Sequence, residues 1–427
     1  MIETASNNHL TILGGGPAGL ASAWFAQRSG MEYELYEASA VPGGNCRTIK
    51  LGDFRIDTGA HRLHHKNAKV TGYFRQLLGN TMREVDSPSQ IYQGGRFFDF
   101  PLKPADLARK MTFGELTKIA AENVVTLFDR APAADDFYQF AVQRYGKTLA
   151  TRFLLNYSAK LWGESTDRLC TAIAGGRLEK LDLAAFVMEL VNPQKARNRH
   201  LDGRFYYPEH GIGQLTDALV SRLDSEKLHC SAPVSRLHWR GDRLTGFETA
   251  NGVYRETESV ISTLPLPLMV RMLEPSAPER IRELAGKVNY RSLILVVLII
   301  DRPSFTENAS IYFPDASVPF TRIYESKNRS SRMAPPHQTA VSAEIPCSEK
   351  DACWQNSGEQ LGETVINQLH KMGLLQKSDV VQATSFRIPN AYPVLTLEAE
   401  KSVRELQNYL SRFDNLHLAG RNARFQY

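Results

Sequence analysis

The first forty residues place short apolar runs on either side of a longer helical stretch. The run at residues 10–13 leads directly into Gly14-Gly15-Gly16-Pro17-Ala18-Gly19, and a helix is predicted from Pro17 to about Ser29. A second apolar run at residues 33–36 ends in Glu37, eighteen residues after Gly19. Strand, glycine turn, helix, strand and acid in this order predict a βαβ unit that binds a dinucleotide.

The rest of the chain alternates between helical and strand-rich patterns. Helices are predicted at residues 67–79, 104–162, 214–224, 354–373 and 395–412. Strands are predicted within residues 54–57, 91–98, 231–263, 289–301, 308–346 and 416–418. A glycine pair in the middle of residues 91–98 predicts a hairpin there.

Nucleotide-type segments recur along the chain with helical and sheet regions between them, so we expect two domains, one of them discontinuous. The cofactor-binding domain is expected from residues 1–66, 205–268 and 375–427. The substrate-binding domain, with a helical insertion, is expected from residues 67–204 and 269–374. The expected fold class is α/β, with an α+β substrate region.

Composition and charge narrow the class of protein. Hydrophobic residues make up 42% and charged residues 23% of the chain, which is typical of a globular protein. The net charge of +5 is spread along the chain and gives no support to a nucleic-acid partner. Five cysteines without metal-ligand spacing favour a reducing compartment and no metal site. The polar residues 1–8 and the shortness of the longest apolar run, at residues 293–300, predict a cytoplasmic protein without a signal peptide or transmembrane segment.

Each residue of the glycine motif has an expected task. Gly14 makes the tight turn, Gly16 lets the backbone approach a pyrophosphate, and Gly19 lets the helix pack against the strand. The N-terminus of the helix directs its N–H groups at the phosphates. Glu37 can accept hydrogen bonds from the ribose hydroxyls.

These elements resemble a known superfamily. Gly14 to Gly19, Glu37 and Gly43-Gly44-Asn45 are similar to the FAD-binding elements of the amine oxidase, protoporphyrinogen oxidase and UDP-galactopyranose mutase superfamily. The resemblance implies FAD as the cofactor and a Rossmann-like FAD-binding domain of the glutathione-reductase type. It also implies cofactor contacts from four further residues: Arg47, Val234, Gly420 and Arg421.

Several segments resemble the UDP-galactopyranose mutases in particular. They are Gly59-Ala60-His61-Arg62-Leu63-His64, Leu161-Trp162-Gly163 with Arg177 beyond it, the segment from Tyr312 to Arg322, Ala391-Tyr392-Pro393, and Gly420-Arg421 with Tyr427. The resemblance implies catalytic roles for His61, Arg177 and Arg322. It implies substrate contacts for Trp162, Tyr312, Tyr392 and Tyr427.

The resemblance implies a flavoenzyme that acts on a small-molecule substrate. Three hypotheses about its function stay open. In the first, a UDP-sugar mutase, N5 of the reduced flavin acts on a nucleotide sugar without net redox change, and Arg177 and Arg322 bind the diphosphate. In the second, an oxidase or dehydrogenase, oxidised flavin takes a hydride from a C–N or C–C bond between aromatic walls. The third, a non-catalytic flavin-binding protein, would lack convergent polar groups. Packing and surface roles stay open for the individual residues, above all core packing for Trp162.

Overall fold

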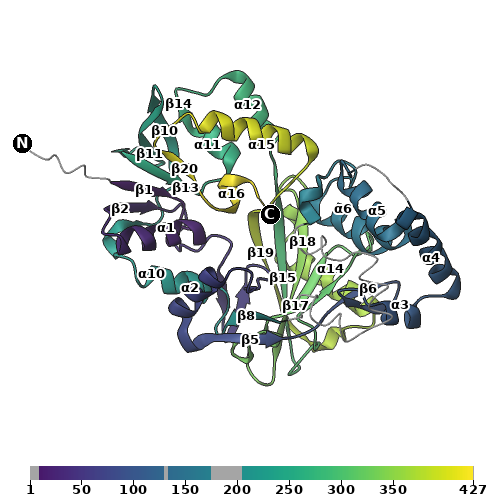
Figure 1. Ribbon diagram of the computed structural model, residues 1–427. Coiled ribbons are helices and arrows are strands. Elements are labelled where there is room, and N and C mark those ends of the chain that lie inside the picture. The colour runs from purple at the N-terminus through teal and green to yellow at the C-terminus, as the bar shows by residue number, and fades with distance from the viewer. Residues whose placement is uncertain (1–8, 129–132, 175–203, 427) are drawn as a thin grey trace, which may run out of the picture.

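A five-stranded parallel sheet forms one end of the molecule. The computed structural model describes residues 9–128, 133–174 and 204–426, and the described chain enters this sheet at once, with β1 (Figure 1). The strand order is β20-β13-β1-β2-β9. The strands are β1 (Leu10–Leu13), β2 (Tyr33–Tyr36), β9 (Leu228–His229), β13 (Ser259–Ser262) and β20 (Leu416–Leu418).

Alternate side chains of these strands enter two different cores. Ile12 and Leu35 pack with Leu20 in a cluster formed with three helices, α1 (Pro17–Arg28), α2 (Ala68–Leu78) and α10 (Gly213–Val220). Leu13 and Tyr36 face the opposite way, into the core cluster that contains the second sheet. That sheet consists of β10 (Val234–Arg240), β11 (Arg243–Thr249), β12 (Tyr254–Glu256) and β14 (Leu273–Glu274). The layered α/β arrangement confirms the predicted fold class and the βαβ unit at its start.

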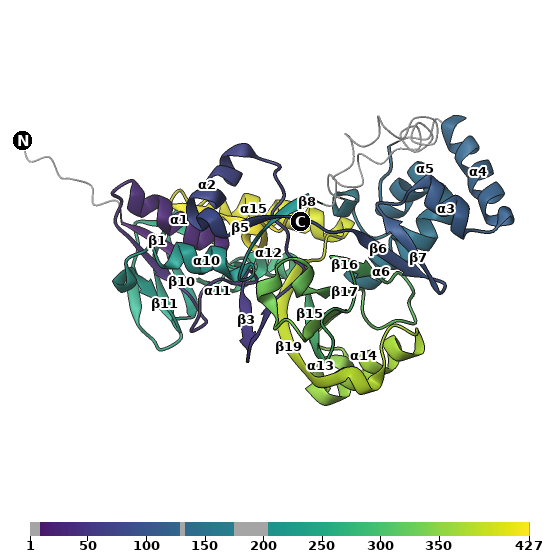
Figure 2. The ribbon, with the colours of Figure 1, turned by 90° about the horizontal axis from the view of Figure 1, so that it is seen from below.

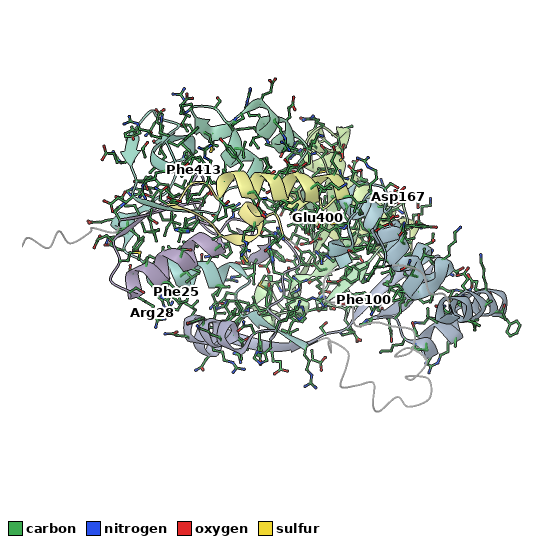
Figure 3. All side chains as sticks on the ribbon, turned by 45° about the horizontal axis from the view of Figure 1, so that its top comes forward. Phe25, Arg28, Phe100, Asp167, Glu400 and Phe413 are labelled. Atoms are coloured by element: carbon green, nitrogen blue, oxygen red, sulfur yellow. The ribbon has the colours of Figure 1, made fainter. Side chains whose placement is uncertain are left out.

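Helix α15 (Leu397–Leu410) closes the second of these cores. Its buried Leu406 and Leu410 join Phe413 in the same cluster as the strands of the four-stranded sheet. Figure 3 labels Glu400 and Phe413, which mark the course of this helix across the molecule. The neighbouring helices are α11 (Leu266–Met272), α12 (Glu279–Gly286) and α16 (Gly420–Arg424).

A seven-stranded, mostly antiparallel sheet forms the other large layer, in the order β19-β15-β18-β17-β16-β6-β7. Only β16 and β6 pair in parallel. The strands are β6 (Ser89–Gln93), β7 (Arg96–Phe100), β15 (Tyr290–Ile300), β16 (Ser310–Tyr312), β17 (Arg322–Glu325), β18 (Thr339–Cys347) and β19 (Val380–Pro393).

Strand β15 is buried on both faces, which explains its continuous apolar run. Ile294 and Val296 pack with helix α14 (Gly358–Lys371), while Leu295 and Val297 pack on the opposite side with the hairpin of β3 (Thr48–Leu51) and β4 (Phe54–Asp57). The hairpin of β6 and β7 around Gly94-Gly95 is confirmed. A further antiparallel pair joins β5 (Met82–Asp86) to β8 (Arg204–Pro208).

A helical arm stands beside β6 and β7, at the far end from the five-stranded sheet (Figure 2). It contains α3 (Pro104–Lys110), α4 (Phe113–Phe128), α5 (Phe137–Leu149), a π-helical stretch (Ala150–Leu155) and α6 (Asn156–Trp162). In the described parts of the chain, no helix combines the length and the hydropathy needed to cross a bilayer.

Two predicted boundaries differ from the structure. The single helix predicted at residues 354–373 is two helices, α13 (Ala352–Gln355) and α14, because Ser357 and Gln360 form a capping box that starts a new helix. Strand β19 lies inside the segment 375–427 assigned to the cofactor domain, yet it pairs along β15 in the seven-stranded sheet. The division into two domains otherwise stays a prediction.

Candidate functional site

The glycine turn after β1 is built so that side chains cannot enter it. Gly14 has φ +98°, and a Cβ atom there would lie 2.3 Å from Oγ1 of Thr263. A Cβ atom at Gly19 would lie 1.9 Å from the carbonyl oxygen of Gly14, so α1 packs directly on the turn. These contacts agree with the structural tasks expected of the two glycines.

The N-terminus of α1 is open toward a second glycine loop. Gly16 is its N-cap and carries no side-chain cap, and the first turn holds no acidic residue. Next to it, the N–H of Gly43 donates to the carbonyl oxygen of Gly15 at 2.8 Å. Nε of Arg47, at the end of the second loop, is buried and finds no hydrogen-bond acceptor among the described residues. Donors without acceptors at a helix N-terminus suit a pyrophosphate, so the residues present fit FAD.

Glu37 follows β2 and faces the same turn. Its Oε2 accepts from the N–H of Gly15 at 2.6 Å, and its Oε1 accepts from the N–H of Ser39 at 2.8 Å. Oε1 also accepts from the hydroxyl of Ser39, so Oε2 is the oxygen that keeps capacity for a ribose hydroxyl. Val234, proposed to lie near the adenine, is buried at the start of β10.

The loop after β4 carries His61 toward the second glycine loop. Nε2 of His61 lies 2.8 Å from the carbonyl oxygen of Asn45. Burial outweighs the bond to Asn45, which raises the pKa of His61, and together with the nearby guanidinium groups of Arg329, Arg421 and Arg322 it lowers that pKa to about 4. The imidazole is therefore neutral at pH 7, with its proton on Nε2, because a carbonyl oxygen can only accept.

The neutral His61 predicts an acid-labile apoprotein. The pKa of His61 is lower in the fold than in the unfolded chain, so its contribution to stability is complete above pH 6.5 and is lost as the pH falls toward 4. The difference corresponds to about 3 kcal/mol of unfolding free energy. Urea unfolding of wild type and His61→Gln across this range measures it. We expect a smaller loss in His61→Gln, and equal losses in both would contradict the assignment.

A buried polar network fixes the base of this loop. Asp57, the last residue of β4, accepts hydrogen bonds from the hydroxyl of Tyr207, from Oγ1 of Thr48 at 2.7 Å and from the N–H of Ile212 at 3.0 Å. Arg329 is 3% exposed, and its guanidinium lies 4.5 Å from the ring centroid of Tyr324. Sequence reasoning missed this network, because its members come from three distant segments, 48–57, 207–212 and 324–329.

Arg322 begins β17 and pairs with a carboxylate on the neighbouring strand. Its Nε and Nη2 lie 3.0 and 2.6 Å from Oε2 of Glu344, the residue opposite it in β18. Glu344 is 1% exposed, and its Oε1 accepts from the N–H of Ala60 at 3.1 Å. Burial alone would lower the pKa of Arg322, but Glu344 holds it well above its ordinary value. The arginine is thus fixed in place by a partner that also offsets its charge.

Three tyrosines surround Arg322. Tyr312, from β16, has its ring centroid 5.9 Å from the guanidinium. Tyr157, from α6, meets the ring of Tyr312 edge-on at 5.8 Å, and Phe100 (labelled in Figure 3) packs on the other side at 5.0 Å. Tyr392 also acts electrostatically on Arg322. The sequence analysis did not include Tyr157 or Glu344, and no local pattern distinguishes them.

Trp162 and Arg421 both lie against Tyr392 and belong to the same cluster of side chains as Arg322. Trp162 is 3% exposed and meets the ring of Tyr392 edge-on at 6.1 Å, so it belongs to the core as well as to this wall. The Arg421 guanidinium lies 5.7 Å from the same ring and donates to the carbonyl oxygen of Ala391. Gly420 brings α16 against α1, because a Cβ atom there would lie 2.8 Å from Cβ of Ala18.

The structure thus gathers His61, Arg322, Tyr312, Tyr392, Trp162 and Arg421 between the glycine loops and the seven-stranded sheet. Arg177 and Tyr427, also predicted for the site, lie outside the described residues. The roles of all these residues in binding and catalysis stay predictions.

Solved structures of two different activities share this fold. A reduced UDP-galactopyranose mutase superposes with a TM-score of 0.86 at 20% identity, covering 98% of this chain and 91% of that one. Putrescine oxidase bound to putrescine superposes with a TM-score of 0.65 at 15% identity, covering 97% and 94%. Coproporphyrinogen III oxidase of Bacillus subtilis (strain 168) is 24% identical over 294 residues, which are 62% of this chain and 61% of that relative's length.

A family model also matches almost the whole chain. The family model described as flavin containing amine oxidoreductase matches residues 17–424. This confirms the predicted superfamily, the predicted FAD and the prediction of a flavoenzyme that acts on a small molecule. The chain belongs to the flavin containing amine oxidoreductase family, with FAD as its cofactor.

Proposed function

We propose that this flavoenzyme interconverts the pyranose and furanose forms of a UDP-sugar. The observation that carries the proposal is the partly buried Arg322 among Tyr157, Tyr312 and Tyr392, close to His61. A cation that stays charged, ringed by hydroxyl groups, suits a diphosphate. The overall likeness to a UDP-galactopyranose mutase adds support from the fold.

Arg322 retains binding capacity despite its ion pair. Glu344 occupies Nε and Nη2, and Nη1 makes no hydrogen bond to the described residues. In the proposed complex, Nη1 donates to a diphosphate oxygen, and the tyrosine hydroxyls complete the anion site. Arg177 and Tyr427 keep their proposed contacts to the substrate on the basis of resemblance.

The rest of the site positions the sugar. Bound FAD in its reduced form supplies a nucleophilic nitrogen, N5, for reaction at the anomeric carbon. His61 is proposed to lie against the flavin as a neutral imidazole, held by the carbonyl oxygen of Asn45. Trp162 and Tyr392 form an aromatic wall whose packing excludes water from one side of the site.

The activity test uses the FAD-loaded protein, reduced with dithionite. Incubated with a UDP-pyranose or a UDP-furanose, it is expected to produce the other ring form with no consumption of oxygen. Chromatography of the nucleotide sugars measures the conversion, and the oxidised protein serves as the control. Reduced protein that neither binds UDP nor converts either sugar form would overturn the proposal.

UDP binding tests the anion site separately. In the double variant Arg322→Gln/Glu344→Gln, the pair keeps its zero net charge and its hydrogen-bonding groups but loses its cation. We expect the Kd for UDP to rise about 10- to 100-fold, equivalent to about 1.4 to 2.8 kcal/mol. Calorimetric titration measures it, with a Tyr92→Phe variant outside the site as the control. Unchanged affinity would remove Arg322 from the diphosphate site.

An oxidase or dehydrogenase is the second candidate. Glu344 favours it, because a carboxylate inside the pocket offsets the charge that an anionic substrate needs. The likeness to coproporphyrinogen III oxidase points the same way. The oxidised protein would then form peroxide with an amine or a porphyrinogen and would not convert UDP-sugars. A coupled peroxidase assay detects the peroxide.

A further inference from the structure

Two free cysteines lie side by side away from the proposed site. Cys347 is the last residue of β18, is 1% exposed and belongs to the apolar cluster under α14. Cys353, in the short helix α13, is partly exposed and packs against the same cluster. The two side chains are near enough for the thiol of Cys353 to act on the pKa of Cys347. Neither thiol has a task in the function proposed above.

The turn between the cysteines holds the pair together. The N–H of Ser348 donates to Oδ2 of Asp351 at 2.8 Å, and the N–H of Asp351 donates back to the carbonyl oxygen of Ser348 at 3.0 Å. Arg291 fastens the turn to the sheet, since its Nη1 lies 3.5 Å from Asp351 and its Nη2 donates to the carbonyl oxygen of Pro346 at 3.1 Å. The chain therefore folds back so that α13 stands over the end of β18.

The two thiols differ in their access to a reagent. Burial, together with the neighbouring Cys353, raises the pKa of Cys347 to about 12, while Arg291 acts in the opposite direction. Cys347 is thus a protonated, covered thiol at neutral pH. Cys353 is the one that solvent reaches, and a partly exposed thiol beside a second thiol is the usual arrangement for reversible oxidation.

We propose that Cys347 and Cys353 form a peroxide-reactive site that closes to a disulfide. In the first step, the sulfur of Cys353 attacks hydrogen peroxide, breaks the O–O bond and becomes a sulfenic acid, with release of one water. In the second step, the sulfur of Cys347 attacks the sulfur of Cys353 and displaces hydroxide, which takes the proton of Cys347 and leaves as water. Two thiols lose two electrons, and one peroxide becomes two waters.

Mass spectrometry of the intact FAD-loaded protein after peroxide treatment tests the site. Trypsin cuts after Lys350, between the cysteines, so Cys347 falls in peptide 333–350 and Cys353 in peptide 351–371. After free thiols are blocked, we expect these peptides joined, at a mass two hydrogens below their sum. Dithiothreitol added before digestion is expected to separate them and restore both alkylation sites.

Matched variants identify the reacting sulfurs. Cys353→Ser is expected to leave Cys347 a free, unmodified thiol at the same peroxide dose, whereas Cys230→Ser, at another partly exposed cysteine, keeps the joined peptides. The proposal is overturned if Cys353 gains two oxygens while Cys347 stays a thiol, or if no joined peptides form at a dose that oxidises Cys230. Both outcomes can be scored on the wild type, so the test holds even if a variant fails to fold.

Discussion

Replacing Gly16 by valine is expected to give a folded protein without FAD. A Cβ atom at Gly16 meets only Cα of Gly44, at 4.0 Å, and its φ of −72° and ψ of −179° lie in a region open to valine. The fold therefore accommodates the side chain. The added methyl groups would instead occupy the space between the two glycine loops, where a pyrophosphate must approach the backbone.

The expected loss of FAD affinity is at least about 100-fold, or about 3 kcal/mol. The apoprotein of Gly16→Val is expected to unfold within about 1 kcal/mol of wild-type apoprotein, because valine is a poorer N-cap than glycine. Absorbance of the purified protein and titration with FAD measure binding, and urea unfolding of the two apoproteins measures stability.

Gly19→Val is the matched control. A Cβ atom at Gly19 would overlap the carbonyl oxygen of Gly14, at 1.9 Å, so α1 has to move away from β1. This variant is expected to lose stability and FAD together. A yellow Gly16→Val protein with wild-type affinity would show that the cofactor does not approach this turn.

Arg322→Ala is expected to lower the unfolding free energy by about 3 to 5 kcal/mol. The substitution removes both hydrogen bonds from the guanidinium to Glu344, which is 1% exposed and would keep only the N–H of Ala60 as a donor. An uncompensated carboxylate in this position must either be hydrated, at the cost of local packing, or take up a proton.

Urea unfolding of three variants separates this effect from lost packing. Adding Glu344→Gln to Arg322→Ala removes the stranded charge, so most of the lost stability is expected to return. Arg322→Lys, which keeps a cation but not the two-pronged geometry, is expected to fall between wild type and Arg322→Ala. If Arg322→Ala proved as stable as wild type, the ion pair would have no structural importance. Because Arg322→Ala is expected to lose stability, it is a poor probe of UDP binding. The neutral double variant Arg322→Gln/Glu344→Gln leaves no unpaired carboxylate and is the better probe.

Local sequence pattern was sufficient for the cofactor half of the protein. A βαβ unit is specified within thirty residues by the apolar runs at Leu10–Leu13 and Tyr33–Tyr36 with two glycines between them, because Gly14 turns the chain at a positive φ and Gly19 lets the helix pack on that turn. The apolar run at residues 293–300 likewise predicted a buried strand, which is β15. Motif resemblance then extended the FAD prediction to segments as distant as Gly420.

The state of the charged groups at the site was decided by the tertiary structure. Glu344 meets Arg322 only because β17 and β18 pair in one particular register, and a one-residue shift would turn either side chain to the other face of the sheet. Tyr157 reaches the same arginine from a helix, α6, that packs on the sheet. The low pKa of His61 likewise comes from burial and from three arginines of remote segments. Hydrophobic periodicity and the conformational needs of a turn are local, so they can be recognised in the sequence. Desolvation and the balance of charge depend on which distant surfaces the fold brings together.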